Sequence, residues 1–124
     1  MSLCLLAAGL LQAKLAWSDF ELRWNHSVEK TLWTEHYEVT PRGLVLDDAS
    51  VEGSGAGMDP PQGAVLRDGA WHYRPDLPPL PSVTLAASAF TADHRLCAAG
   101  SCHALHSLVP DAPKDVPITL QACR

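Results

Sequence analysis

The chain has 124 residues, of which 47% are hydrophobic and 19% are charged, with a formal net charge of −5 at pH 7. This length suits one domain, and the composition predicts a folded chain with an apolar core rather than a disordered chain. The acidic balance and the lack of a Lys/Arg cluster exclude a nucleic-acid partner, which requires concentrated positive charge.

The first sixteen residues, MSLCLLAAGLLQAKLA, are nearly all apolar, and Lys14 carries their only charged side chain. The stretch is shorter than the roughly 20 residues that span a bilayer, but its length matches the apolar region of a secretory signal. It has neither the basic start nor the small-residue cleavage site of such a signal. We expect residues 1–16 to form a signal-like or anchor helix, with a buried helix as the alternative, and residues 17–124 to form a single β domain.

Two consecutive segments predict the first hairpin of that domain. Apolar and polar residues alternate strictly over 20–26, which is the pattern of a half-buried strand. A second run of β-forming residues covers 31–39, and Glu35 lies on the apolar face of this run. The turn between the two strands is predicted near residues 27–30.

The remainder of the chain reads as short strands separated by turns. The turn Pro41-Arg42-Gly43 precedes a strand that begins at 44–46, and an Asp68-Gly69 turn predicts a second hairpin. The Gly- and Pro-rich segment 52–63 predicts irregular structure, and 75–81 predicts an extended connector. Further strands are predicted at 64–66, 70–73, 83–87, 95–97 and 118–123. The fold class is therefore mostly β, a small antiparallel β-sandwich or barrel with an N-terminal apolar helix.

The four cysteines are Cys4, Cys97, Cys102 and Cys123, and in an exported protein the last three are the disulfide candidates. Spacing leaves the pairing open between Cys97–Cys102, Cys102–Cys123 and Cys97–Cys123. A zinc site is the alternative, because His103 and His106 follow the Cys-x4-Cys segment. The spacing of the two histidines is tighter than that of a zinc finger, so we favour a disulfide and predict no metal.

Two features suggest a binding site. His26 continues the apolar face of the first strand, and a hairpin would bring it within reach of Glu35, as a carboxylate-oriented imidazole or as a buried pair that fixes strand register. The Gly-rich segment 53–57 would present backbone N–H groups to an anion, or form a plain loop. The candidate binding residues are His26, Ser27, Glu29, Glu35, Gly53, Ser54, Gly55, Gly57 and Asp59.

Four segments are together similar to a known family: FELRWNHSVEKT (20–31), WTEHYEV (33–39), GSGAGMDPP (53–61) and DGAWHYRP (68–75). On these segments the chain resembles the prokaryotic domain-of-unknown-function family 1850, over about residues 18–124 and including the late Cys-x4-Cys pattern. The resemblance implies an exported protein, whose relatives are often encoded beside tripartite (TRAP-type, TAXI subclass) solute transporters. It implies no catalytic residues, because the family has none established.

From these features we expect a periplasmic or extracytoplasmic accessory or ligand/protein-binding domain associated with a TRAP/TAXI-type transport system. Its partner would be a component of that transporter or its solute, and it would meet the membrane only through residues 1–16. One alternative is a purely structural or protein-interaction domain. Another is a small hydrolase-like enzyme using His26 and Glu35. The sequence identifies no enzyme class and predicts no cofactor.

Overall fold

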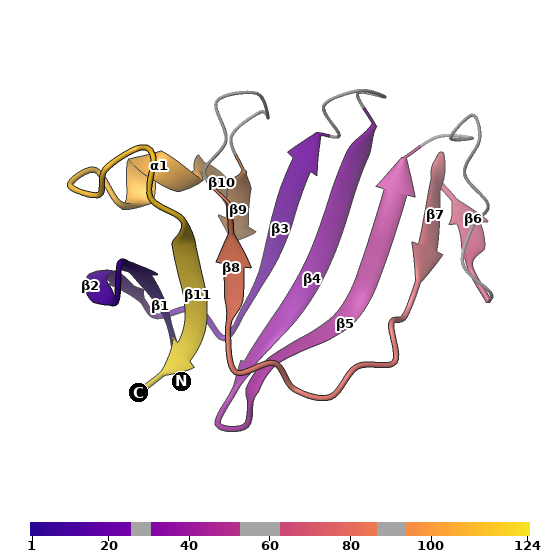
Figure 1. Ribbon diagram of the computed structural model, residues 1–124. Coiled ribbons are helices and arrows are strands. Elements are labelled where there is room, and N and C mark those ends of the chain that lie inside the picture. Colours follow the sequence, from indigo (N-terminus) through magenta and orange to yellow (C-terminus); the bar gives the residue numbers. More distant parts are fainter. Residues whose placement is uncertain (26–30, 53–62, 87–93) are drawn as a thin grey trace.

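The computed structural model describes residues 1–25, 31–52, 63–86 and 94–124, and these form two antiparallel sheets (Figure 1). The smaller sheet has the strand order β2-β1-β11-β8, and the larger has the order β10-β9-β3-β4-β5-β7-β6. The elements are β1 Ser2–Ala7, β2 Leu10–Leu15, β3 Asp19–Asn25, β4 Leu32–Thr40, β5 Gly43–Glu52, β6 Val65–Arg67, β7 Ala70–Tyr73, β8 Val83–Leu85, β9 Arg95–Ala98, β10 Ser101–Ala104, α1 Leu105–Leu108 and β11 Ile118–Cys123.

The two sheets share one hydrophobic core at one end of the larger sheet. Alternate side chains of β1 and β11, such as Leu5 and Leu120, are fully buried in the same cluster as Phe20 and Leu22 of β3. Strands β6 and β7 lie at the opposite end of the larger sheet, away from the smaller one (Figure 1). The predicted mostly β, antiparallel, two-sheet arrangement is therefore confirmed, and the described strands of both sheets keep open edges rather than closing into a barrel.

The predicted N-terminal helix is wrong, because residues 1–16 contain the hairpin β1–β2. Ala8 and Gly9 connect the strands with positive φ angles of 51° and 78°, the geometry of a tight hairpin turn. Strand β1 pairs along its whole length with β11 at the other end of the chain, from Ser2 opposite Cys123 to Ala7 opposite Ile118. The apolar residues of β1 are thus explained by a strand placed between two others, whereas β2 is an edge strand in which Leu10 and Leu11 are exposed.

The hairpins predicted inside the larger sheet are confirmed. Strands β3 and β4 pair over seven residues, from Asp19 opposite Glu38 to Asn25 opposite Leu32. The Asp68-Gly69 turn joins β6 to β7, with positive φ at both turn residues. Strand β10 and the short helix α1 were not predicted, since their sequences carry no strong strand or helix period.

A β-bulge in β5 decides which side chains reach each face of the larger sheet. His36 lies opposite Asp48 and Tyr37 lies opposite Leu46, so Asp47 is the extra residue. The bulge shifts the alternation by one position, and both Leu46 and Ala49 point into the apolar side although they are three residues apart. Asp47 and its neighbour Asp48 are consequently left for the polar face.

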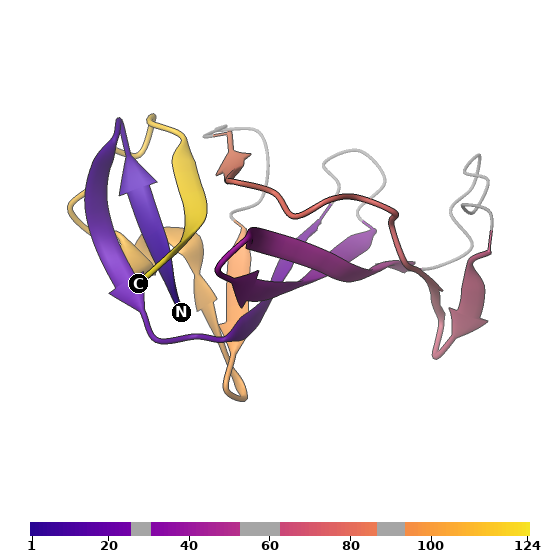
Figure 2. The same cartoon turned by 90° about the horizontal axis from the view of Figure 1, so that it is seen from below.

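The segment that follows β7 returns across the sheet and delivers β8 to the other layer (Figure 2). It is fixed where Leu44 and Leu80 exchange two backbone hydrogen bonds of 2.8 Å. Gly43 permits this close approach, because a Cβ there would lie 2.5 Å from the Leu80 carbonyl oxygen and the residue has a φ of +126°. The predicted extended connector is thus held at its far end by a backbone bridge.

All four cysteines form disulfides, Cys97 with Cys102 and Cys4 with Cys123. The second pairing was not predicted, and the predicted pairings of Cys123 with Cys97 or Cys102 are wrong. The Cys97–Cys102 alternative is confirmed, and it excludes the zinc alternative because neither sulfur is available as a thiolate ligand. Stable disulfides are typical of oxidising compartments, which indicates an extracytoplasmic location. Among the residues placed by the structure, no helix has the length and apolar character needed to cross a bilayer.

Candidate functional site

Glu35 is a carboxylate placed on the apolar face of the larger sheet, as the sequence predicts. The strand pairing sets it between Leu22 of β3 and Ala49 of β5, and Tyr73 of β7 follows Ala49 in the same row. Leu22 and Ala49 are buried, whereas Glu35 and Tyr73 are half-buried. The carboxylate therefore lies within an apolar row rather than on the solvated side of the sheet.

The next row along the same face is rich in tryptophan. It runs from Trp24 through Trp33 and Val51 to Trp71, across β3, β4, β5 and β7. The Trp24 and Trp33 rings stack with centroids 6.2 Å apart, and the buried Nε1 group of Trp33 has no hydrogen-bond partner among the described residues. We call Trp24, Trp33, Glu35, Trp71 and Tyr73 the aromatic–acidic patch. Trp24 packs against the shared core, and the other four residues of the patch are not part of that core.

The charge of Glu35 has little compensation in this patch. Tyr37 donates a hydrogen bond of 2.8 Å from its hydroxyl to Glu35 Oε1. Burial raises the pKa of Glu35, and the Tyr37 hydrogen bond only partly opposes this effect. None of the ion pairs between described residues involves Glu35. A positive charge brought to this carboxylate would stabilise its ionised form.

The other predicted binding residues cannot be placed beside Glu35. Those residues, which lie outside the described part of the chain, are His26, Ser27, Glu29, Gly53, Ser54, Gly55, Gly57 and Asp59. The His26–Glu35 pair and the anion-binding loop therefore stay predictions. Of the expected His26–Glu35 pair, the structure describes only Glu35, which accepts a hydrogen bond from Tyr37.

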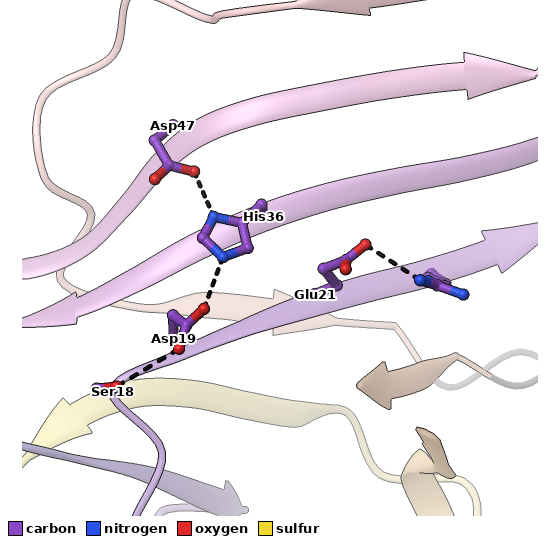
Figure 3. A network of polar contacts seen from close by, with 6 residues as sticks. Ser18, Asp19, Glu21, His36 and Asp47 are labelled. Carbon is purple, nitrogen blue, oxygen red and sulfur yellow. Dashed lines mark hydrogen bonds and ion pairs between the residues drawn. The ribbon is translucent and has the colours of Figure 1, made fainter. Parts of the chain in front are cut away.

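A second polar cluster lies on the opposite face of the same sheet and was not predicted. His36 of β4 stands between Asp19 of β3 and Asp47 of β5 (Figure 3). Its Nδ1 is 2.6 Å from Asp47 Oδ1, and its Nε2 is 3.0 Å from Asp19 Oδ2. The bulge in β5 creates this arrangement, because it places Asp47 beside the imidazole.

This geometry fixes the protonation state of His36. Ionised carboxylates only accept hydrogen bonds, so a carboxylate at each ring nitrogen favours the doubly protonated imidazolium form of the ring. Burial alone lowers the pKa of His36, but the hydrogen bonds to Asp47 and Asp19, together with their charges, outweigh it and raise the pKa overall. His36 thus acts as a cationic link between three neighbouring strands.

A cavity of about 420 Å³ opens beside this cluster. One wall is the polar side of β3 and β4, where Glu21 forms an ion pair of 3.3 Å with Arg23. The other wall is the turn between β9 and β10, with the Cys97–Cys102 disulfide at its base. That turn projects away from the larger sheet (Figure 2). The cavity is therefore polar, charged and bordered by a disulfide.

We expect the contribution of His36 to stability to depend on pH. Because its pKa is raised on folding, the stabilisation is complete below about 6.5, the pKa of an unperturbed histidine, and is lost as the pH rises through the higher folded value. His36→Gln should lower the free energy of unfolding by about 1 kcal/mol at pH 5.5, since the pair is partly screened by solvent. Urea unfolding of both proteins between pH 5.5 and 9 would measure how far the difference in the free energy of unfolding between wild type and His36→Gln decreases as the pH rises.

The same substitution at His103 of β10 controls for removal of a half-buried histidine elsewhere on the larger sheet. If the His36→Gln difference stays constant over the whole pH range, the imidazolium assignment is wrong.

Sequence reasoning missed this cluster for an identifiable reason. His36 follows Glu35 directly, and neighbouring side chains of a strand point to opposite faces. The alternation that predicts the apolar face therefore places His36 on the polar face, where it predicts no partner for the imidazole. The pair Asp47-Asp48 inside an otherwise apolar strand was the signal for a bulge. Within the described residues, no group of three or more His, Cys, Asp or Glu side chains is arranged to hold a metal ion.

The fold and these two clusters define the protein as a small, disulfide-bonded domain of two antiparallel sheets, with charged side chains on one face of the larger sheet and the aromatic–acidic patch on the other. The chain belongs to the family described as Domain of unknown function (DUF1850), which matches residues 20–105. The match includes the aromatic–acidic patch, His36, Asp47 and the Cys97–Cys102 disulfide, whereas Asp19 and the strands β1, β2 and β11 lie outside it. Comparison with curated proteins gave no match, and neither did comparison with solved structures.

Proposed function

We propose that the protein is an extracytoplasmic binding domain that acts as an accessory to a solute transporter of the tripartite TRAP/TAXI type. We further propose that its ligand carries a positive charge, held by Glu35. The observation that carries this proposal is a half-buried carboxylate, in an aromatic surrounding, that forms no ion pair with any described residue.

The chemistry of the aromatic–acidic patch supports a small organic cation as the ligand. Aromatic ring faces attract cations, most strongly when the site is shielded from water. The paired rings of Trp24 and Trp33 lie in the row next to Glu35, so one ligand would meet both the ring faces and the carboxylate.

Choline and its uncharged isostere 3,3-dimethyl-1-butanol form a matched pair of probes. We expect the wild-type domain to bind choline more tightly than the isostere, and Glu35→Gln to weaken choline binding at least about tenfold, the equivalent of 1.4 kcal/mol. Because burial raises the pKa of Glu35, the affinity for choline should fall as the pH falls through that pKa, and binding near it should release a proton. Isothermal titration calorimetry in two buffers of different ionisation enthalpy measures both effects.

Glu38→Gln is the matched control, since Glu38 is exposed on the opposite face of the same strand and should leave choline binding unchanged. Equal binding of the two probes, or equal loss in the two variants, would exclude Glu35 as the cation site.

The transport role requires a separate test in cells. A strain lacking the protein should take up the solute of its TRAP/TAXI-type transporter more slowly than the wild type. Restoration by the wild-type gene but not by Glu35→Gln would connect the binding site to transport. Unchanged uptake in the deletion strain would contradict the accessory role, while leaving the binding result intact.

A further inference from the structure

The two disulfides of this domain occupy unequal positions. Cys4–Cys123 joins strands at opposite ends of the chain with a sequence separation of 119, and Cys4 is 5% exposed. Cys97–Cys102 spans a separation of 5 at the base of a hairpin turn. Strand β10, which carries Cys102, is the outermost strand of the larger sheet. One bridge is therefore internal and the other is peripheral.

The backbone already holds Cys97 and Cys102 together without the bridge. The two residues are directly paired in the ladder between β9 and β10, with Cα atoms 3.9 Å apart. Ala99 and Gly100 form the tight turn, both with positive φ. Opening the disulfide would thus release no long loop, and the two thiols would remain within reach of each other for re-oxidation.

Exposure separates the two sulfur-bearing residues. Cys102 is exposed, whereas Cys97 is 8% exposed and lies against β3, opposite Glu21. Both line the cavity of about 420 Å³, so a reductant has room to approach the bridge. Exposed disulfides are those most readily exchanged, and attack occurs at the accessible sulfur. Cys102 is therefore the expected point of attack and Cys97 the expected leaving group.

We propose that Cys97–Cys102 is a reversible thiol–disulfide exchange site for an extracytoplasmic protein dithiol. A thiolate of the dithiol attacks Cys102 Sγ, a mixed disulfide forms, and Cys97 Sγ leaves as a thiolate. The second thiol of the partner then attacks the mixed disulfide and releases Cys102. Two electrons and two protons pass to the cysteine pair, and the partner dithiol is oxidised to a disulfide.

Arg23 assists the departure of Cys97. It lies two residues beyond Glu21 on the same face of β3, which places it diagonally across from Cys97 in the paired strands. The buried Nε group of Arg23 has no hydrogen-bond partner in the part of the chain that the structure describes, and its Nη2 is 3.3 Å from Glu21 Oε2. A cation in this position stabilises the thiolate that forms when the disulfide opens, and the ion pair with Glu21 reduces this effect.

The proposal is tested by equilibrating the folded, full-length protein with mixtures of reduced and oxidised dithiothreitol, followed by alkylation and peptide mass spectrometry. We expect Cys97 and Cys102 to become half-reduced at a ratio of reduced to oxidised reagent at least about 100-fold lower than Cys4 and Cys123. Circular dichroism should show a native fold at that point. Reduction of both bridges at one ratio, or only on unfolding, would overturn the proposal.

Single variants test the direction of attack. Cys97→Ser leaves Cys102 as the free thiol, and Cys102→Ser leaves Cys97. With oxidised glutathione as the probe, the mixed disulfide should form at least about ten times faster on Cys102 than on Cys97, because only Cys102 is exposed. Equal rates, or faster reaction of Cys97, would contradict the assigned order of steps.

Discussion

A chain that begins at residue 17 is expected to remain unfolded at 25 °C. The deletion removes β1 and β2, two of the four strands of the smaller sheet, and with them Leu3 and Leu5, which are fully buried. Each such leucine contributes roughly 1.5–3 kcal/mol through burial, and their loss also uncovers β11. The two leucines together give about 3–6 kcal/mol, and the loss of the Cys4–Cys123 disulfide adds about 5 kcal/mol. This total is comparable to the whole stability of a small domain, about 5–15 kcal/mol. Near-ultraviolet circular dichroism and urea unfolding would show a chain without fixed packing.

Two full-length variants separate the causes of this loss. The truncated chain should carry Cys123→Ser to avoid a free thiol. The full-length double variant with Cys4→Ser and Cys123→Ser then measures the contribution of the disulfide alone. Leu11→Gln, at a position 59% exposed in β2, controls for a change in the hairpin that leaves the core intact. A cooperative unfolding transition in the truncated chain would show that residues 1–16 are dispensable for folding. We propose that they remain part of the functional domain.

Replacing Cys4 and Cys123 together by alanine should lower the free energy of unfolding more than replacing Cys97 and Cys102. A disulfide restricts the unfolded chain more strongly when the loop is longer, and the two separations are 119 and 5 residues. The chain-entropy relation predicts a loss of about 5 kcal/mol for the first pair and about 2 kcal/mol for the second. Denaturant titration of the two double variants measures both values.

The internal control in this comparison is the wild-type protein unfolded with and without reductant. Its stability difference should be close to the sum of the two variant effects, because the bridges lie in different sheets. Equal losses from the two double variants would indicate that native-state packing, rather than restriction of the unfolded chain, dominates both bridges.

Strand β4 unites the two candidate sites, since Glu35 and His36 are neighbours that point to opposite faces of the larger sheet. On one face the carboxylate has a hydrogen bond from Tyr37 and no ion pair with a described residue, and on the other the imidazolium is held by two carboxylates. The negative charge of Glu35 is therefore available to pair with a cationic ligand, whereas the charge of His36 is already paired with Asp19 and Asp47. This difference is why we assign ligand binding to Glu35 and a strand-linking role to His36.

Local sequence was sufficient for the features that depend on neighbouring residues. The two-residue period over 20–26 and 31–39 predicted β3, β4 and their pairing, and it placed Glu35 on the apolar face. The Asp-Gly turn predicted β6 and β7 in the same way. His26 and the Gly-rich loop stay predictions, because they lie outside the described residues.

The sequence by itself determined a mostly β, disulfide-bonded domain and the face on which Glu35 lies, because side-chain alternation and turn chemistry are short-range properties of the chain. Only the tertiary structure decided that the apolar N-terminus is a strand, since its partner β11 is more than 100 residues away and their pairing depends on folding of the whole chain. The same holds for Asp19, His36 and Asp47, which come together through strand register and a single bulge. Strand register and bulges are set by packing between strands that are distant in the sequence, so no single segment predicts them.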